Sequence, residues 1–583
     1  MVISELVIYS HFLDQFIRDL ELNLTKADIA KPIWLAYKEQ TDGITALHSW
    51  SLQPFEAHHP DYYVFGNDST PLQEQLNTAL EWLKMDAFSR PGLIMIYCKE
   101  TLKILENVDE SVVQKSLAEV DGILDRFFGE LNREAILDCV NVVVLSDEGL
   151  TNGLTMMDVH QYSSGYNVSN PNPLTTIHAV ESGKFNRSFT FSCSKENSRK
   201  IFLPSTLPTR WHSSLSENSG DILLSTTLNG GKCRHVDTES DCPDEGMQTF
   251  FFAQGPSFNS GLVLPKIQNI ELMNLWLDLL NMHYLPNNGT IGIMDEALRK
   301  PKRREKRRRF GIRECPFVNE EFVINCGGCT ALQQARITKW MNSCDQPNRP
   351  VVLFSSSSFS PCYQKICEKL IVIGTDGDDS LALVELFHQN NTVARSESDC
   401  RYVNSRYRYE CPTLMSSEGY ELRSLSPNPK KVLAREATIQ VSWKSTFITD
   451  VLDPLNDYTL AISKELGRVI CITGTAYDRN FDGIADKERR GSPSHLYRIL
   501  IACSSGWSSD GFTCTHARST KVLAFIFPHM DRDANCLPSR ELLLLYTARL
   551  KDVELIAGMD IDLPGVSATH ALYLKVSVVN HLW

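Results

Sequence analysis

Apolar positions in the first part of the chain alternate between short continuous runs and helical spacing. The runs at 92–97 and 142–145 contain no charged residue, which is typical of strands that are buried on both faces of a parallel sheet. Residues 111–133 place apolar side chains three or four positions apart, so we predict a helix there. A strand, a helix and a second strand form a βαβ unit, and the sequence therefore predicts a parallel sheet.

The pattern continues with a strand at 247–255 and an amphipathic helix at 269–282. We therefore predict one α/β domain over residues 1–298. Residues 413–583 combine a long helical pattern with apolar strand runs, which predicts a separate α+β domain. The helix is expected at 445–467 and the strands at 468–474, 495–503 and 521–529.

Between these domains lies a strongly basic run, with nine basic residues among the eleven at 299–309. Like charges repel one another, so we predict an exposed linker at 299–310. An alternative is proteolytic processing at Arg304 and Arg307, because proteases cut exposed linkers. Nuclear targeting and polyanion binding rank lower. Residues 311–412 form a cysteine-rich connecting region that includes the start of the last domain.

Charge and hydropathy narrow the class of protein. The chain has 71 acidic and 58 basic residues, and its formal net charge is -13. This balance argues against a nucleic-acid coat protein. No run of about 18 apolar residues occurs, so the sequence predicts no transmembrane segment.

Cysteines and glycosylation sequons indicate the secretory route, because 17 cysteines would be unusual in a reducing cytosol. For the pair Cys326 and Cys329 we expect disulfides rather than zinc, since Cys362 and Cys367 do not repeat their spacing. The odd total leaves at least one thiol unpaired or bonded to another chain. The predicted glycosylation sites are Asn23, Asn67, Asn167, Asn186, Asn288 and Asn390.

The start of the chain does not look like a signal peptide, because Glu5, His11 and Asp14 interrupt any apolar core. Either the N-terminus is incomplete or the chain is not secreted as it stands. We expect a secreted or extracellular protein whose signal or anchor segment is not present in this sequence.

A run near the end alternates oxygen-bearing side chains in the way of the first part of an EF-hand loop. Such side chains converge on one cation, and a glycine, here Gly483, permits the sharp turn. The usual twelfth-position Glu is replaced by Arg489, so we predict a structural Ca²⁺ site in a loop between strands. The alternative is an acidic turn. The predicted ligands are Asp478, Asn480, Asp482, Ile484 through its backbone carbonyl, and Asp486.

The strand run at 142–145 ends on Ser146, Asp147, Glu148 and Gly149. Ligands of open α/β sheets gather where parallel strands end. Asp147 is therefore a candidate metal ligand, with a solvated strand end as the alternative.

Several stretches follow one another in a family-specific order, and "LPNNGT" and "DVELIAGMD" are the most specific. With them the chain resembles the ectonucleotide pyrophosphatase/phosphodiesterase family of the alkaline-phosphatase superfamily. The resemblance implies an alkaline-phosphatase-like, mostly parallel sheet flanked by helices, followed by a smaller α+β nuclease-like domain that holds Ca²⁺. The matching stretches are 31–34, 90–97, 139–151, 247–258, 269–290, 474–486, 493–504, 525–529 and 548–560.

The resemblance also implies a reaction in which two zinc ions clamp a phosphate and a threonine attacks it. In the family, a strand ending in Asp-Gly and the nucleophilic Thr both precede the "PIW" motif. Residues 1–30 contain neither that strand ending nor a Pro-Thr-Phe-Pro-Asn-His pattern, and Thr25 belongs to a sequon. We therefore expect no nucleophile.

The other zinc ligands that the resemblance implies are mostly replaced. Leu102 stands where the family has Asp, and Glu106 lies near its expected His. Asp147 matches an Asp-His-Gly motif, but Glu148 replaces the His, and His235 matches a later His. Each zinc needs three or four ligands, so we interpret Asp147, Glu148 and His235 as a vestigial site and expect Zn²⁺ to be lost. A rebuilt carboxylate site for a harder cation ranks lower.

The sequence thus predicts a degenerate phosphodiesterase homologue without turnover. It would act outside the cell as a binding or interaction protein, with a nucleotide or phospholipid-like molecule as ligand and nucleic acid disfavoured. The alternative is an active metal-dependent phosphodiesterase or nucleotide pyrophosphatase whose N-terminus is truncated in this sequence.

Overall fold

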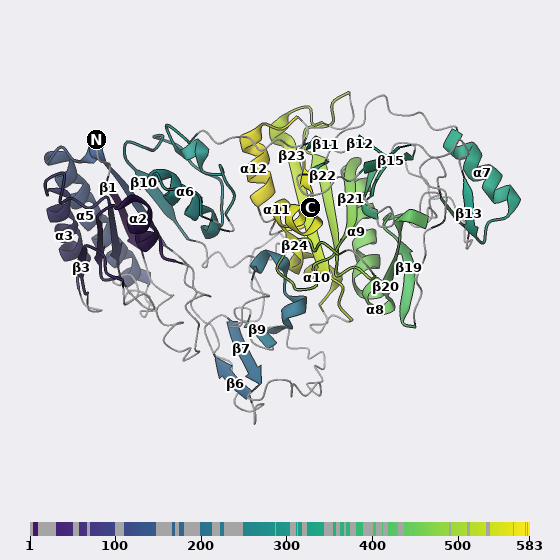
Figure 1. Cartoon of the computed structure of the whole chain (residues 1–583), viewed down its shortest axis with the longest axis horizontal. Helices are drawn as coiled ribbons and strands as arrows, with labels where there is room; N and C mark the ends of the chain where they lie inside the picture. The colour runs from purple at the N-terminus through teal and green to yellow at the C-terminus, as the bar shows by residue number, and fades with distance from the viewer. Residues whose placement is uncertain are drawn as a thin grey trace. The chain divides into compact units, whose positions relative to one another are not determined.

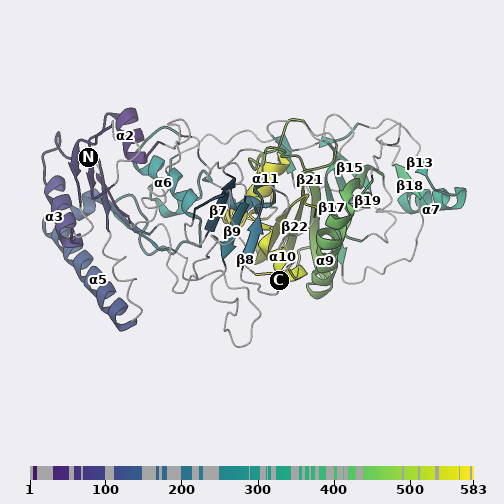
Figure 2. The same cartoon turned by 90° about the horizontal axis from the view of Figure 1, so that it is seen from below.

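The computed structural model describes two compact units, formed by Met1–Thr155 with Cys242–Glu305 and by Met156–Asp241 with Lys306–Trp583 (Figures 1 and 2). Residues 156–241 group with the second unit, which the residue pattern did not predict; the domain boundaries drawn from the sequence stay predictions. The described residues are 4–9, 31–50, 58–66, 70–98, 110–146, 166–169, 174–179, 199–212, 222–226, 249–302 without 286 and 288, 310–316 without 312, 323–342, 354–356, 362–366, 369–373, 380–388, 400–403, 411, 418–428, 437–488, 491–509, 513–531, 537–563, 565–577, 579 and 581–583.

The first unit contains a six-stranded sheet in the order β10-β5-β1-β4-β2-β3. All neighbours pair in parallel except β10, which is antiparallel to β5 at the edge. This mostly parallel sheet confirms the predicted α/β class. Its strands are β1 (Ser4–Tyr9), β2 (Thr45–His48), β3 (Tyr62–Val64), β4 (Leu93–Tyr97), β5 (Val140–Leu145) and β10 (Phe251–Gln254).

Two helices, α3 (Leu72–Leu83) and α5 (Glu110–Arg133), pack on one face of this sheet. The contact is apolar, for example between Leu76 of α3, Phe127 of α5 and Ile94 of β4. The strand–helix–strand unit predicted from the sequence is confirmed as β4–α5–β5. However, β4 and β5 are not neighbours, because β1 lies between them. Shorter helices are α2 (Ile33–Thr41) and α6 (Leu272–Leu279).

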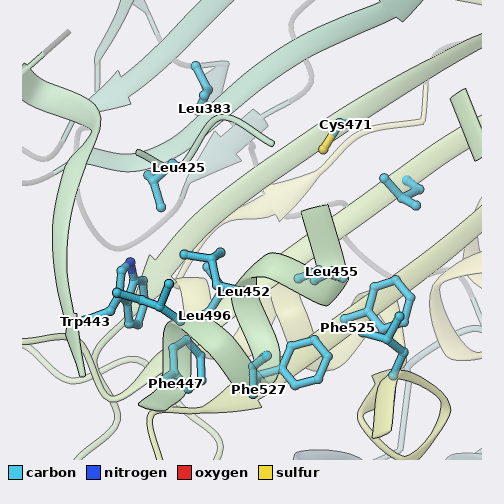
Figure 3. Close-up of a cluster of buried hydrophobic side chains, with 14 of the residues drawn as sticks. Leu383, Leu425, Trp443, Phe447, Leu452, Leu455, Cys471, Leu496, Phe525 and Phe527 are labelled. Carbon is cyan, nitrogen blue, oxygen red and sulfur yellow. The ribbon is translucent and has the colours of Figure 1, made fainter. Parts of the chain in front are cut away.

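The second unit is built on an eight-stranded sheet in the order β12-β15-β16-β17-β21-β22-β23-β24. Successive side chains of a strand point to opposite faces, so the sheet supports two cores. Leu383, Cys471 and Phe525 belong to one core (Figure 3), and Val384 and Ile472 belong to the other. The strands are β12 (Arg313–Glu314), β15 (Cys362–Ile366), β16 (Lys369–Ile373), β17 (Ser380–His388), β21 (Arg468–Ala476), β22 (His495–Cys503), β23 (Thr520–Pro528) and β24 (Thr547–Ala548).

Helices cover both faces of this sheet. The predicted helix at 445–467 is confirmed as a helical stretch made of α8 (Ser445–Phe447), a π-helical turn (Ile448–Leu452) and α9 (Asp453–Glu465). This helical stretch packs in the core that contains Phe525, and α11 (Leu550–Ala557) packs in the core that contains Ile472. The other helices of this part are α10 (Ser539–Leu545) and α12 (Ala568–Val576).

Smaller sheets complete the second unit. Four antiparallel strands, in the order β6-β7-β9-β8, come from the segment 156–241. The strands of the smaller sheets are β6 (Tyr166–Ser169), β7 (Leu174–Ala179), β8 (Arg199–Phe202), β9 (Ile222–Thr226), β11 (Phe310–Gly311), β14 (Phe354–Ser356), β19 (Tyr420–Ser424), β20 (Gln440–Lys444) and β25 (Asp560–Ile561).

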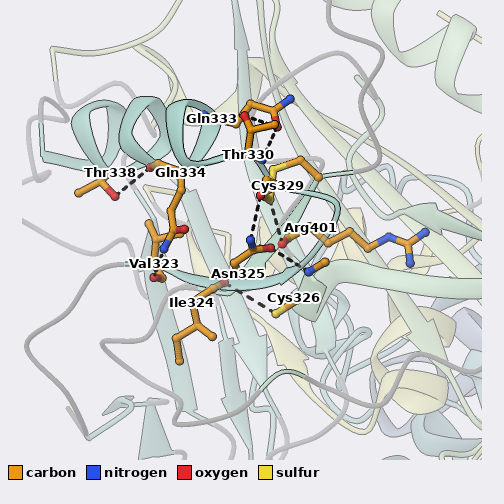
Figure 4. The surroundings of a disulfide bond; sticks show 12 residues. Val323, Ile324, Asn325, Cys326, Cys329, Thr330, Gln333, Gln334, Thr338 and Arg401 are labelled. Carbon is orange, nitrogen blue, oxygen red and sulfur yellow. Dashed lines mark hydrogen bonds between the residues drawn. A yellow bond between two sulfur atoms is a disulfide. The ribbon is translucent and has the colours of Figure 1, made fainter.

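The Cys-Gly-Gly-Cys stretch joins β13 (Ile324–Gly327) to α7 (Ala331–Asn342), beside β18 (Arg401–Val403) (Figure 4). Its two cysteines form the disulfides Cys326–Cys411 and Cys329–Cys400, which confirms the prediction of disulfides. Further disulfides are Cys315–Cys362 and Cys503–Cys514. Among the described residues, no helix combines the length and the apolar character that a membrane crossing requires.

Candidate functional site

The carboxyl ends of the parallel strands in the first unit meet at one edge of the sheet. In the register of β1 with its neighbours, Tyr9 lies opposite Tyr97 and Ile8 lies opposite Val144. β2 ends at the same level, because His48 pairs with Ile96. Ligands of such sheets bind at this edge, so we call it the strand-end edge and treat it as the candidate active site.

β1 occupies the centre of the strand-end edge, between the strands that precede the two predicted ligand motifs. It continues directly into Ser10 and His11. Sequence reading missed this strand, because its aliphatic stretch, residues 6–8, is only three residues long. The available signal was the run "ELVIY", which is rich in strand-forming residues.

β5 leads to the predicted vestigial zinc site. Ser146 N donates a hydrogen bond to Phe250 O at 3.2 Å, and Phe250 N donates to Ser146 Oγ at 3.1 Å. The chain entering β10 thereby fixes the residue that precedes Asp147. The vestigial site stays a prediction, because Leu102, Glu106, Asp147, Glu148 and His235 lie outside the described residues.

The predicted modification sites are mostly outside the described residues as well. Asn167 lies in β6. The start of the basic run is attached to the first unit, since Arg299 Nε donates to Phe258 O at 2.7 Å and Lys302 Nζ donates to Met282 O at 3.0 Å. The sites outside are Asn23, Asn67, Asn186, Asn288, Asn390, Arg304 and Arg307.

A buried polar group that sequence reasoning missed lies at the end of β2. His48 Nδ1 is 2.9 Å from Ser49 Oγ, and Gln75 Nε2 donates to the same oxygen at 3.2 Å. Burial lowers the pKa of His48, and the nearby charge of Glu74 opposes this. Gly66 packs so closely that a Cβ there would lie 1.7 Å from Ser49 Oγ. These contacts fix the end of β2 against α3 and the residues after β3.

The predicted calcium loop connects β21 to β22. Main-chain N–H groups of the loop donate to its carboxylates: Asp482 N and Gly483 N each lie 3.0 Å from an oxygen of Asp478. Arg479 N donates to Asp486 Oδ2 at 2.8 Å. Gly483 has a φ of 78°, a conformation that favours glycine. The loop is therefore tightly folded around Asp478.

Negative charge is concentrated in this loop. The pKa of Asp478 is raised to about 6, chiefly by burial and also by the neighbouring Asp482 and Asp486, against the hydrogen bonds from Gly483 and Asp482. The donor chemistry suits Ca²⁺, which binds carboxylate, amide and carbonyl oxygens. Within the described part of the chain, however, no three His, Cys, Asp or Glu side chains are grouped closely enough to hold a metal ion. The calcium site therefore stays a prediction.

The "LPNNGT" stretch is explained by its packing against the start of α6. Asn274 and Asn287 exchange two amide hydrogen bonds, both of 3.2 Å, and Gly289 N donates to Asn287 Oδ1 at 2.8 Å. Thr290 donates to the buried Glu271 through both its N–H and its hydroxyl. The motif thus has a structural role, because it holds the chain that follows α6 against the start of that helix.

Gly289→Ala should destabilise the first unit by about 2 kcal/mol or more, because overpacking forces the backbone to shift. The new Cβ would lie 2.5 Å from Ile270 O. Gly129→Ala in α5 is the matched control, since its Cβ meets nothing within 4 Å, and it should be neutral or stabilising by up to about 1 kcal/mol. Thermal unfolding followed by circular dichroism compares them. Equal shifts for both variants would contradict the packing argument.

This chain resembles known proteins that are named as phosphodiesterases or nucleotide pyrophosphatases. The sequence model of the family described as type I phosphodiesterase / nucleotide pyrophosphatase matches residues 10–231. An ectonucleotide pyrophosphatase/phosphodiesterase of Caenorhabditis elegans is 29% identical over an alignment of 598 positions, which covers 95% of this chain and 77% of the relative. Human ectonucleotide pyrophosphatase/phosphodiesterase family member 1 is 24% identical over 91% of this chain and 64% of its own length. A venom phosphodiesterase of Macrovipera lebetinus is 23% identical over 96% of this chain and 74% of its own length.

Over most of its length, the chain is therefore similar to proteins named ectonucleotide pyrophosphatase/phosphodiesterase, and part of it matches the phosphodiesterase family model.

Proposed function

We propose that this chain binds a phosphate-bearing ligand at the strand-end edge without hydrolysing it. The observation that carries the proposal is the central position of β1. In the family, a strand ending in Asp-Gly supplies the first metal ligand, whereas β1 continues into Ser10 and His11. Ser10 thus follows β1 where the family has its carboxylate ligand, and His11 where it has glycine.

The sequence that follows β1 also bears on the nucleophile. Residues 10–30 are the whole connection from β1 to the residue before Pro32. They contain no Pro-Thr-Phe-Pro-Asn-His pattern. The attacking threonine of the family is therefore not found in the sequence between β1 and Pro32. Without an attacking hydroxyl, covalent catalysis has no first step.

A nucleotide is the first ligand to test, because the relatives' names refer to nucleotide pyrophosphatase activity. A phospholipid-like molecule is the second. Both present a phosphate, and equilibrium dialysis with adenosine monophosphate and with a lysophospholipid separates them.

The decisive experiment combines metal analysis of the purified chain with hydrolysis of a nitrophenyl nucleotide ester. We expect no turnover and no zinc, together with retained nucleotide binding. About two zinc ions per chain with turnover would instead establish an active two-metal phosphodiesterase.

We further propose that loop 478–486 binds one Ca²⁺ with a structural role. The alternation of oxygen donors and the crowding of Asp478, Asp482 and Asp486 support this. A bound cation would neutralise the repulsion between these carboxylates. The chain's own contribution is to hold Asp478 in place through the two main-chain N–H donors.

Asp482→Ala should lower the thermal midpoint more with calcium than with chelator, because the variant loses a cation ligand in addition to the hydrogen bonds that Asp482 accepts from Ile484 N and Asn480 Nδ2. Asp457→Ala on the exposed face of α9 is the matched control. Differential scanning fluorimetry with calcium and with chelator measures both. A calcium-independent loss, or no loss, would remove the loop from the proposal.

We also propose that the protein acts outside the cell. Four disulfides among the described residues support an oxidising compartment. The sequons and the relatives named as ectoenzymes or venom enzymes agree with this.

A further inference from the structure

A short segment from the first half of the chain is embedded in the core of the second unit. We name residues 202–212 the strap. Phe202 and Leu207 are buried in the same apolar cluster as Phe525 and Phe527 of β23. Trp211 packs edge-on against Phe202, with ring centroids 5.1 Å apart. The strap thus contributes to a core whose other residues lie far away in the sequence.

Polar contacts fix the strap at the end of α10. Arg210 Nη1 donates to Thr547 O at 2.7 Å and also to Leu545 O. Leu545 is the last residue of α10 and Thr547 begins β24. The last carbonyls of a helix lack partners inside the helix, so Arg210 supplies a donor to the carbonyl of Leu545. In return, Tyr546 Oη donates to Thr206 O at 2.8 Å. Burial lowers the pKa of Arg210 to about 10, which still leaves the guanidinium charged at neutral pH.

The end of the strap meets a buried charge pair at the start of α11. His212 Nε2 lies 3.0 Å from Asp552 Oδ1 and 2.8 Å from Arg549 Nη2. Both partners are buried, whereas the His212 side chain is 20% exposed. The strap is therefore anchored by apolar packing, by the carbonyls of Leu545 and Thr547 and by this pair.

We propose that the strap joins the two halves of the chain non-covalently, so that cleavage between residues 302 and 310 leaves one folded particle. A cut there places the strap in the N-terminal fragment and its partners on β23, α10 and α11 in the C-terminal fragment. The C-terminal fragment alone would expose the end of α10 and part of its core.

The test uses the full chain with residues 303–309 replaced by the recognition sequence of a specific protease. After complete cleavage, we expect both fragments to co-elute in gel filtration at about 1 µM, a concentration that only a tight complex survives. They should separate on a non-reducing denaturing gel. Separation in gel filtration would overturn the proposal, and so would a band that stays joined on the non-reducing gel, since a disulfide would then be the link.

Two variants connect the result to the strap. Arg210→Met should weaken the association of the cleaved fragments by about ten- to a hundredfold, because a charged donor to two buried carbonyls is lost. Tyr546→Phe removes a single hydroxyl and keeps the ring, so it should weaken the association of the fragments less than Arg210→Met does. Arg133→Met is the control, since Arg133 is an exposed arginine of the same fragment. If Arg210→Met fails to fold, Tyr546→Phe decides. Association equal to that of the control would overturn the proposal.

Discussion

Replacing Asp552 with Ala should lower the unfolding free energy of the second unit by about 3 to 5 kcal/mol, because it leaves a buried cation without its partner. Asp552 and Arg549 have side-chain exposures of 0% and 1%. Arg549 Nε donates to both oxygens of Asp552 at 3.0 Å, and Arg549 N donates to Oδ2 at 3.2 Å. Although burial opposes it, hydrogen bonds from His212 and Arg549 hold the pKa of Asp552 below its usual range.

An exposed pair of similar geometry provides the control for this prediction. Arg423 Nη2 lies 2.7 Å from Glu421 Oε2, but the two side chains are 42% and 46% exposed. Glu421→Ala should therefore cost less than about 1 kcal/mol. Urea unfolding of both variants measures the difference between their losses of unfolding free energy. Asp552→Asn is added because it keeps the shape of the side chain and removes its charge. Equal losses for Asp552→Ala and Glu421→Ala would show that burial does not amplify this ion pair.

Acid should destabilise the second unit through His495. This side chain is buried at the start of β22, with Nδ1 2.9 Å from Ser494 Oγ. Burial, assisted by the nearby His529, lowers its pKa to about 3. The unfolded chain therefore binds a proton between pH 6.5 and 3 that the folded chain does not bind. Stability falls as the pH drops through this window, by on the order of 4 kcal/mol at its lower end.

His495→Gln should flatten the pH dependence of unfolding between pH 6 and 4 by up to about 1.4 kcal/mol per pH unit, the slope of one proton. His516→Gln is the control, because His516 is an exposed histidine of the same unit. Urea midpoints at several pH values measure the slopes. A slope unchanged in His495→Gln would assign the acid sensitivity to other groups.

Long periodic patterns were sufficient to predict much of the fold. The helix α5 and the strands β4, β5, β21 and β22 all correspond to continuous apolar or helical patterns. β1 was missed because three aliphatic residues are too few to show a strand pattern. Its place between β4 and β5 depends on contacts between strands that are distant in the sequence. Disulfides were predicted for Cys326 and Cys329, but their partners follow from the fold.

The sequence indicated where the candidate sites lie in the fold, but not which side chains surround them. The ends of β4 and β5 do lie at one edge, and the acidic loop does connect two strands, as the sequence indicated. The strap could not be foreseen. Its residues, "FLPSTLPTRWH", contain two prolines and no periodicity, which is typical of a loop. What holds it in place lies in a distant part of the sequence.

That distance has a consequence for synthesis. Arg210 and the carbonyl of Thr547 are separated by 337 positions. Ribosomes add roughly 5 to 20 residues per second, so the strap emerges on the order of 17 to 70 s before its partners exist. During this interval Phe202, Leu207 and Trp211 have none of the apolar surface of β23 and α10 to cover them. The yield of folded protein should therefore depend on chaperones that bind this segment while the rest of the chain is still being made.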